Sequence, residues 1–465
     1  MLKNSGAELY QRLAAVVGAR NVLTAEQDVA PYCRDLLGVY HGRPHCVVRP
    51  ASTQEVAAAV AICAAANAPM VPCGGNTGFC GGSIPDDSGT QVVLALGRMN
   101  RIRWIDVAGD AIAVDAGCVL AQVREQATAQ GRLLPLSHGG EGSSQIGGNL
   151  ATNAGGLNVL RYGMARELVL GLEAVLADGR VLDMMRSLRK DNTGYDLKQL
   201  FVGSEGTLGI VTGAVLKLFP LPSHRETVLA AIGSPGGAVE LLAHARAELG
   251  NSICAFELVP RSGMALYLDF DRAAADPFAK PHPWYVLIEL EGEGLEAALE
   301  SPLRSGQVVD AVVAQSEGQR ASLWRMREGL AMAQVADPSN LKNDTSVPIA
   351  AIAQFIERAS AEVERVVPGV RPIPFGHIGD GNIHFNLSRP LEMEAAGFVE
   401  RWPELVAAVE AVALALGGSI SAEHGIGRAK REALRHARSP VELEMMRSLK
   451  RALDPRGLMN PGKLL

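Results

Sequence analysis

The sequence predicts an α+β protein of more than one domain, on three observations. The chain has 465 residues, 48% of them hydrophobic, and at roughly 150 residues per domain this length predicts two or three domains, of which we expect two. Strand-like runs and helical segments are mixed along the chain. The chain has 50 glycines, and three clusters of them lie before residue 220, which places tight bends or close ligand approaches in that part.

Composition and charge argue against several kinds of partner and location. The chain has 44 basic and 50 acidic residues, and this balance gives no electrostatic reason for nucleic acid to bind. Its seven cysteines form no C-x-x-C pair, which argues against a thiolate zinc motif and favours a reducing compartment. Glu8 and Arg12 lie where a signal peptide would be apolar, and the longest apolar stretch, 56–71, is too short to span a bilayer. We expect a soluble, cytoplasmic protein.

The first 220 residues combine short helices with strand-like runs. A helix is expected over 1–20, and Ser52 with Glu55 forms a capping box that begins another. A polar helix is expected to end at Gly131. Apolar or β-branched runs predict strands at 46–50, 91–96, 102–106, 111–117, 168–179 and 209–219.

Pro220 and Pro222 predict a domain boundary. Beyond them, the strand-like runs 228–232 and 285–292 alternate with helices, which is typical of a separate α+β domain. A Pro- and Gly-punctuated tail ends the chain. We therefore expect a first domain over 1–220, a second over 221–415, and a C-terminal segment over 416–465 that packs back on the first.

The first glycine cluster follows an apolar run and contains five glycines between Gly74 and Gly82. Exposed backbone N–H groups in such a loop can converge on phosphate oxygens. A flexible surface loop is the alternative, but ordering so many glycines costs conformational entropy. The cluster is neither G-x-G-x-x-G nor G-x-x-x-x-G-K-[ST], so a Rossmann or P-loop site lacks its fingerprint. We expect a different nucleotide-binding fold.

Two further clusters repeat the combination of glycine with small polar residues. The segment 143–156 has paired glycines and two asparagines, and the segment 201–210 reads FVGSEGTLGI. With these motifs the chain resembles, over essentially its whole length, the flavoproteins of the vanillyl-alcohol oxidase type. Among them it is most similar to the D-2-hydroxyacid dehydrogenases, which include D-2-hydroxyglutarate and D-lactate dehydrogenases, with the glycolate oxidase subunit as a relative.

The resemblance implies a two-lobe FAD-binding domain, formed by 1–220 and the C-terminal segment, and an α+β cap domain that carries substrate residues. FAD is then expected to bind non-covalently. The implied FAD-binding residues are Pro72, Gly74, Gly75, Asn76, Thr77, Gly78, Gly81, Gly82, Ser83, Ser143, Gly147, Gly148, Asn149, Thr152, Asn153, Gly155, Gly156, Glu205, Gly206, Ile210 and Asn460. His138 departs from the family, where an aliphatic residue is usual. Some members of this broad family attach FAD through histidine, but an ordinary loop histidine is the favoured interpretation.

Two short segments near the other end combine histidine with carboxylates. Polar and apolar residues alternate around His384, which indicates a strand, and a glycine-rich turn would bring His377 beside it. These imidazoles and Glu423 could meet around one divalent ion and leave a position open for substrate. Scattered structural histidines are the alternative. The resemblance implies that His377, His384 and Glu423 are zinc ligands and that His424 is the general base.

Oxidation of a hydroxyacid requires removal of the hydroxyl proton, which an imidazole accepts near neutral pH, and transfer of a hydride to flavin N5. By resemblance, Arg327 and Lys342 hold the substrate carboxylates, while Asn386, on the same strand face as His384, makes another substrate contact. Without the resemblance, surface cations are the simpler interpretation. Ala331 stands where D-2-hydroxyglutarate dehydrogenases have a hydroxyl residue, which leaves the exact acid open.

The expected activity is FAD- and zinc-dependent oxidation of D-2-hydroxyglutarate to 2-oxoglutarate, or of D-malate, ahead of D-lactate, because two cations are expected to face the substrate. Electrons would pass to a separate acceptor such as an electron-transfer flavoprotein or a quinone, and a homodimer is a candidate assembly. A metal-dependent hydrolase and a non-catalytic nucleotide-binding subunit are the alternatives. A colourless purified protein would favour the hydrolase.

Overall fold

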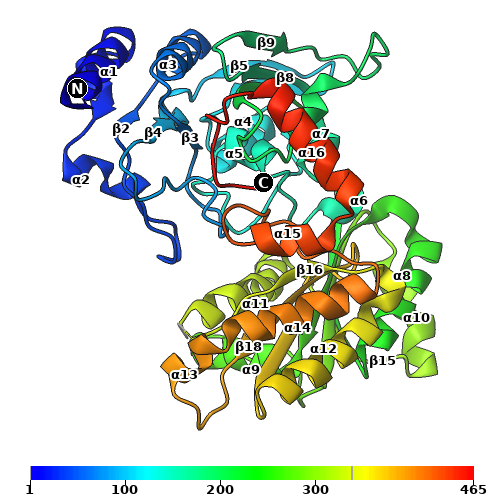
Figure 1. The fold of residues 1–465 in the computed structure, drawn as a ribbon. Helices are drawn as coiled ribbons and strands as arrows, with labels where there is room; N and C mark the ends of the chain where they lie inside the picture. The colour runs from blue at the N-terminus through cyan, green and yellow to red at the C-terminus, as the bar shows by residue number, and fades with distance from the viewer. Residues whose placement is uncertain (1, 337–338) are drawn as a thin grey trace. The chain divides into compact units, whose positions relative to one another are not determined.

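The computed structural model describes residues 2–336 and 339–465 (Figure 1). The chain forms two compact units. Unit 1 comprises Met1–Gly156, Gly163–Leu221 and Glu423–Leu465, and unit 2 comprises Leu157–Tyr162 and Pro222–Ala422. Helices and strands alternate in both units, as expected for an α+β protein.

The unit boundaries differ from the prediction at two places. The chain returns to unit 1 at Glu423 rather than at residue 416, because Ser419 pairs with Ser346 of unit 2 through two backbone hydrogen bonds of 2.8 and 3.1 Å. The short segment Leu157–Tyr162 also belongs to unit 2, since the Tyr162 hydroxyl donates a hydrogen bond to Glu291. Such distant pairings leave no local signal in the sequence.

The first sheet of unit 1 has the order β1-β2-β4-β3, and β2 and β3 both run parallel to the central strand β4. Its strands are β1 (Val22–Leu23), β2 (Cys46–Val48), β3 (Met70–Cys73) and β4 (Val92–Ala95). Helix α3 (Thr53–Ala65) connects β2 with β3 and begins where predicted, because Ser52 Oγ accepts the backbone N–H of Glu55. The Glu55 carboxylate closes the cap on the N–H of Ala51 instead of Ser52.

The second sheet of unit 1 is antiparallel, with the order β5-β6-β10-β8-β9. Its strands are β5 (Ile102–Asp106), β6 (Ala111–Asp115), β10 (Ile210–Lys217), β8 (Val169–Val175) and β9 (Val181–Met184). Two buried carboxylates, Asp115 and Glu173, are both held by Arg103, at 2.7 Å from Nε and from Nη2. One guanidinium therefore compensates two carboxylates that would be costly to bury unpaired.

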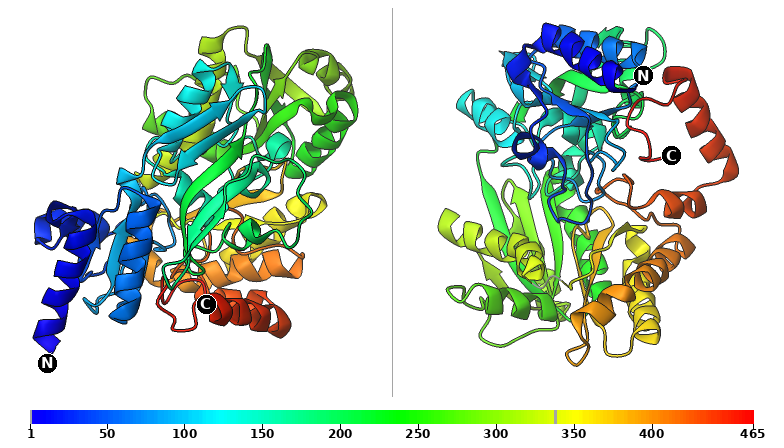
Figure 2. Two further views of the ribbon diagram at one scale, coloured as in Figure 1. Left: turned by 90° about the horizontal axis from the view of Figure 1, so that it is seen from above. Right: turned by 60° about the vertical axis from the view of Figure 1, so that its left-hand side comes forward.

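The C-terminal segment closes unit 1. After helices α15 (Arg431–Ala437) and α16 (Pro440–Leu453), the tail lies along the edge of β3: Met70 donates to the carbonyl of Leu458 (2.7 Å), and Asn460 donates to that of Met70 (2.8 Å). The red tail lies beside the blue strands in both views of Figure 2. This pairing places Asn460 next to the glycine loop that follows β3.

A four-stranded antiparallel sheet forms the centre of unit 2, in the order β13-β14-β12-β15. Its strands are β12 (Arg225–Ile232), β13 (Ile253–Pro260), β14 (Trp284–Glu291) and β15 (Val308–Val313). Alternate residues of β12 belong to two separate hydrophobic clusters, as the two-residue period of a strand requires. Helices α8 (Pro235–Leu249) and α10 (Leu295–Ser305) contribute to one cluster, and α9 (Arg261–Phe270) and α11 (Glu317–Val335) to the other.

A second sheet of unit 2, in the order β16-β18-β17, carries the histidine motif. Its strands are β16 (Asp344–Ser346), β17 (Arg371–Phe375) and β18 (Asn382–Ser388). Helices α12 (Ile352–Val366) and α14 (Trp402–Ala415) pack in the same hydrophobic cluster as Ile383, Phe385 and Leu387 of β18. The polar residues of this strand must therefore point to its other face.

The remaining elements are short or peripheral. They are α1 (Leu2–Val17), α2 (Glu26–Val29), α4 (Leu120–Ala129), α5 (Ile146–Ala151), α6 (Val159–Tyr162), α7 (Ala165–Leu168), α13 (Ala395–Glu400), the strand pair β7 (Arg132–Leu133) with β11 (Phe219–Pro220), and several single 3₁₀ turns. Within the described ranges, none of the helices has the length and apolar character needed to cross a membrane.

Candidate functional site

The three glycine clusters meet around one cavity in unit 1. It has about 960 Å³ of empty space, including open solvent at its mouth. Most of the residues predicted to bind FAD line it. These are Pro72, Gly74, Gly75, Asn76, Thr77, Gly78, Gly82, Ser83, Gly147, Gly148, Asn149, Thr152, Glu205, Gly206 and Ile210.

Glycine has two different roles in this cavity. A Cβ atom at Gly75 would lie 2.0 Å from the carbonyl oxygen of Ser143. The close approach of the first two loops at this point therefore requires a glycine at position 75. At Gly78 and Gly148, in contrast, a Cβ would meet no atom within 4 Å. Because both residues line the cavity, a side chain there would project into its empty space. The second role therefore keeps space for a ligand.

Six predicted residues are not among those that line the cavity. They are Gly81, Ser143, Asn153, Gly155, Gly156 and Asn460. The Asn460 side chain donates to the carbonyls of Gly82 (3.0 Å) and Glu205 (2.7 Å) and so joins two of the loops. Asn153 has a left-handed backbone (φ 50°), and its side chain accepts the N–H of Arg166 (2.9 Å). These contacts of Asn460 and Asn153 support the loops, while the buried Oδ1 of Asn460 has no hydrogen-bond partner among the described residues.

The wall also includes residues without an assigned role in the sequence prediction. They are Cys73, Cys80, Leu96, Ala116, Gln145, Ala151, Gly209 and Val211. Among these, Gln145 precedes α5, and its buried Oε1 has no hydrogen-bond partner among the described residues. A buried acceptor of this kind is costly unless a ligand or water satisfies it. No motif distinguishes Gln145 from an ordinary loop residue.

His138 is held outside the cavity wall. Its Nδ1 accepts the N–H of Gly140 (3.1 Å), while Nε2 lies 3.3 Å from Asn149 Oδ1 and 3.4 Å from Ser144 Oγ. Both ring nitrogens thus contact protein groups, and one of these groups belongs to a residue of the wall. These contacts hold the His138 ring within its own loop.

His424, the predicted base, lines the same cavity of unit 1. Its ring centroid lies 4.9 Å from that of Phe79, at an interplanar angle of 64°. The backbone that follows is fixed by Glu205, whose carboxylate accepts the N–H groups of Ile426 (2.8 Å) and Gly427 (2.7 Å). Burial raises the pKa of Glu205, although both N–H groups oppose this shift. The carboxylate thereby anchors the segment that presents His424.

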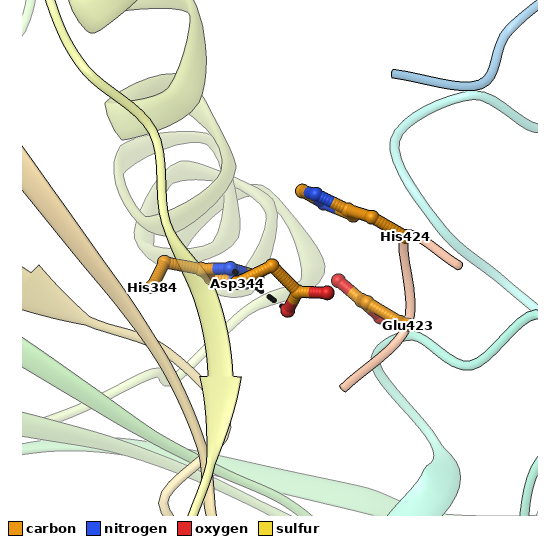
Figure 3. Close-up of side chains that lie close together, drawn as sticks. All are labelled: Asp344, His384, Glu423 and His424. Atoms are coloured by element: carbon orange, nitrogen blue, oxygen red, sulfur yellow. Dashed lines mark ion pairs between the residues drawn. The ribbon is translucent and has the colours of Figure 1, made fainter. Parts of the chain in front are cut away.

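In unit 2, the polar face of β18 carries Asn382, His384 and Asn386. Strand register places His384 directly opposite Asp344 on β16 and Phe375 on β17. His384 Nδ1 lies 3.8 Å from Asp344 Oδ1, the ion pair drawn in Figure 3. Asp344 is buried and also accepts Asn382 Nδ2 (3.0 Å). The sequence prediction had assigned no site role to Asp344.

The chain itself connects the Asp344–His384 pair of unit 2 with the cavity of unit 1. The backbone N–H of Ala422 donates to Asp344 Oδ2 (3.1 Å), and the next two residues are Glu423 and His424. Because consecutive Cα atoms are about 3.8 Å apart, the predicted ligand Glu423 begins one peptide away from a residue bonded to Asp344. In Figure 3, Glu423 and His424 extend from this one segment.

His377 and Arg327 share a buried carboxylate that the sequence prediction missed. Glu257, on β13, receives His377 Nδ1 at 2.8 Å on Oε1, and Arg327 Nε (2.8 Å) and Nη2 (2.7 Å) on Oε2. Burial alone would raise the pKa of Glu257, but His377 and Arg327 outweigh it and lower the pKa to about 2. Since Nδ1 faces Glu257, any metal bond of His377 must use Nε2. Nothing local in the sequence marks a strand glutamate as the partner of both.

The remaining predicted substrate residues have distinct surroundings. The buried Asn386 donates to Gln334 Oε1 (2.6 Å) and accepts the N–H of Asn343 (3.0 Å), so its amide is held by protein groups. Lys342 is half-buried, and burial lowers the pKa of its ammonium group. Ala331, one turn after Arg327 on α11, is exposed. Arg327 and Asn386 are therefore preoriented side chains.

Both parts of the chain match known protein families. Residues 44–185 match an FAD binding domain, and residues 221–464 match the C-terminal domain of FAD linked oxidases. The chain is similar in fold to p-cresol methylhydroxylase (TM-score 0.79, 17% identity, 99% of this chain and 97% of that one). It is also similar to alkyldihydroxyacetonephosphate synthase (TM-score 0.74, 19% identity, 98% and 85%). These structures show the fold.

Curated relatives match nearly the full chain. A D-2-hydroxyglutarate dehydrogenase of Xanthomonas citri pv. viticola is 38% identical, over 97% of this chain and 96% of the relative. The mitochondrial D-2-hydroxyglutarate dehydrogenase of Arabidopsis thaliana is 37% identical (97% and 80%), and a putative D-lactate dehydrogenase of Schizosaccharomyces pombe is 34% identical (95% and 85%). The chain is therefore an FAD-dependent oxidoreductase with the vanillyl-alcohol oxidase fold, and it belongs to the family of the D-2-hydroxyglutarate dehydrogenases.

Proposed function

We propose that this protein oxidises D-2-hydroxyglutarate to 2-oxoglutarate, with FAD in the cavity of unit 1 and a zinc ion beside it. One observation carries the proposal. His424 lines the cavity, while Ala422, two residues earlier, is hydrogen-bonded to the carboxylate opposite His384. The chain thus links a candidate base, a candidate metal ligand and the cofactor cavity within three consecutive residues. Because the chain belongs to an oxidoreductase family, the hydrolase alternative is set aside.

Three features of the cavity of unit 1 support FAD as its ligand. Gly78 and Gly148 leave space that any side chain would fill, and the unsatisfied Oε1 of Gln145 offers an acceptor to a bound ligand. Glycine-rich loops also supply the backbone N–H groups that suit a pyrophosphate. When bound, FAD supplies a two-electron acceptor for the hydride of the substrate carbon.

The donor set fits a divalent metal of borderline softness. Imidazole nitrogen from His384 and His377, with the Glu423 carboxylate, is the two-histidine, one-carboxylate set that zinc accepts while one position stays open. Asp344 Oδ1 lies 3.8 Å from Nδ1 of His384, so it adds negative charge beside this imidazole. Asp344, His384, Glu423 and His424 carry ligand atoms that lie within 4.8 Å of one another and could hold an ion, and His377 is not part of this group. A bound metal would acidify the substrate hydroxyl.

His424 takes the hydroxyl proton in this proposal. The residue contacts Phe79 through its ring and follows Glu423 in the chain, so its imidazole is adjacent both to a metal ligand and to the flavin cavity. The Glu205 carboxylate holds the next turn of backbone. A base that is fixed before the substrate arrives needs little reorganisation during the reaction.

Arg327 and Lys342 supply positive charge for the substrate carboxylates. One edge of the Arg327 guanidinium is oriented by Glu257, and its remaining N–H groups can donate to a ligand carboxylate. Lys342 adds a second, half-buried cation. Two cations favour a dicarboxylate, so D-malate is the second candidate substrate and D-lactate the third. An electron-transfer flavoprotein or a quinone would reoxidise the flavin.

The substrate assignment predicts which acids bleach the flavin. Anaerobic mixing with D- and L-2-hydroxyacids should reduce it fastest with D-2-hydroxyglutarate, more slowly with D-malate and D-lactate, and negligibly with L enantiomers. Stopped-flow absorbance at the flavin band measures these rates.

Prior treatment with a strong chelator should abolish reduction and leave FAD bound, and added Zn²⁺ should restore it. Reduction by L acids, or full activity in protein shown to be metal-free by elemental analysis, contradicts the proposal.

The cavity assignment predicts that Gly148→Val folds but binds FAD poorly. The new side chain enters space that the proposal gives to FAD, so we expect FAD affinity to fall at least tenfold, or about 1.4 kcal/mol. Gly397→Val is the matched control, because Gly397 also lies in a short helix with no atom near its Cβ position but does not line the cavity. Flavin content and fluorescence titration measure binding. Equal FAD affinity in both variants would place the cofactor elsewhere.

The base assignment predicts that His424→Ala slows flavin reduction by roughly 10²- to 10⁴-fold, with a much smaller change in substrate affinity. Single-turnover kinetics at saturating D-2-hydroxyglutarate separate the two effects. His436→Ala, at an exposed histidine of α15, should reduce at the native rate. A His424→Ala variant that reduces flavin normally would require another base.

A further inference from the structure

Glu257 occupies an unusual position in unit 2. It lies in the middle of β13 and is about 1% exposed, and its neighbours Phe256 and Leu258 point into the hydrophobic cluster on the opposite face of the sheet. A charge at such a position is expensive unless its partners are also fixed. Here each carboxylate oxygen has its own partner, His377 on Oε1 and Arg327 on Oε2.

Backbone pairing explains how His377 reaches this strand. Leu258 and Gly376 exchange backbone hydrogen bonds of 2.8 and 3.1 Å in an antiparallel bridge. Antiparallel pairing therefore places Glu257 opposite His377, one residue along from this bridge. Gly376 has φ 141° and would clash with the carbonyl of Asn382 at 2.8 Å if it carried a Cβ. The glycine therefore allows the turn that aligns His377 with Glu257.

Arg327 reaches the same carboxylate from α11. The side chains of Arg320, Trp324 and Arg327 follow the three- and four-residue spacing of one helix face. Arg320 and Trp324 donate to Glu289 of β14, and Arg327 donates to Glu257 of β13. Two buried glutamates on neighbouring strands therefore hold one helix face, but only Glu257 also contacts a histidine of the proposed metal site.

We propose that Glu257 is a positioning residue, which fixes His377 in the tautomer that offers Nε2 to a metal and holds Arg327 in register with it. This inference rests on the proposed function, because it assigns His377 to the metal and Arg327 to the substrate. In this proposal the metal ligand His377 and the substrate-binding Arg327 both depend on the side chain of Glu257. The two are then set at a constant separation before substrate binds.

The chemistry of the carboxylate explains why glutamine cannot replace it. An ionised carboxylate accepts hydrogen bonds on both oxygens, and Nδ1–H of His377 and the N–H groups of Arg327 are all donors. A glutamine at position 257 must turn its NH₂ group toward one of them. Facing His377, it favours the tautomer with the proton on Nε2, which cannot bind a metal; facing Arg327, it opposes two donors. Either orientation breaks one half of the arrangement.

Glu257→Gln and Glu289→Gln form a matched pair for the test. Glu289 is likewise buried and bonded to α11, so both variants weaken the contact between helix and sheet. We expect Glu257→Gln alone to bind Zn²⁺ about 10- to 100-fold more weakly, the usual effect of losing a carboxylate behind a metal-binding histidine. It should also raise KM for D-2-hydroxyglutarate. Zinc content after dialysis against graded chelator, in FAD-loaded protein, measures the first effect.

The possible outcomes separate this inference from the function on which it rests. Wild-type protein that retains zinc no better than His384→Ala would remove the metal, and with it both proposals. Wild-type protein that holds zinc while Glu257→Gln holds it equally tightly would overturn the role of Glu257 alone. Equal weakening in Glu289→Gln would show a general effect of loosening α11, which also overturns it.

A second measurement needs no variant at position 257 and no metal. In metal-free protein labelled with ¹⁵N-histidine, the His377 resonance, assigned with His377→Gln, should show a proton on Nδ1 and none on Nε2 at a pH where the ring is neutral. This holds even if Glu257→Gln fails to fold. The opposite tautomer would contradict the inference.

Discussion

The segment from Ala422 to Gly427 is held at both ends by carboxylates, and the proposed chemistry depends on this constraint. Asp344 accepts the N–H of Ala422 at one end, and Glu205 accepts those of Ile426 and Gly427 at the other. Between these anchors lie Glu423 and His424. A short backbone with both ends held in this way leaves little conformational freedom to Glu423 and His424.

Carboxylates are placed throughout the protein where they orient other side chains. Asp344 faces His384, Glu257 holds His377 and Arg327, and Glu289 holds Arg320. Replacing a buried ion pair by apolar residues often leaves stability unchanged or improved, so stability alone does not explain why these charges lie inside. Directional hydrogen bonds do explain it, because an apolar contact cannot fix the tautomer of an imidazole or the plane of a guanidinium.

Features with a local signature were predictable from the sequence. Glycine density identified the loops around the cavity, Ser52 marked the start of α3, and alternation around His384 identified β18 with its polar face. The family resemblance gave the cofactor, and the comparisons confirmed the fold and the family. Local patterns and a whole-chain resemblance are the two kinds of information that a single sequence carries well.

Features that depend on distant pairing were not predictable. Glu257 meets His377 only because Leu258 pairs with Gly376, and the chain returns to unit 1 at Glu423 only because Ser419 pairs with Ser346. The orphaned acceptor of Gln145 appears only once three loops enclose it. A strand glutamate or a loop glutamine looks ordinary until the fold supplies its neighbours.

Anomalous diffraction at the zinc absorption edge, from crystals of the FAD-loaded protein, tests the central claim most directly. The account predicts one strong peak about 2.0–2.2 Å from Nε2 of His377 and His384 and from a carboxylate oxygen of Glu423, with the flavin ring in the cavity lined by His424. A peak whose ligands exclude Glu423, or the absence of a peak in protein that still oxidises D-2-hydroxyglutarate, would contradict it.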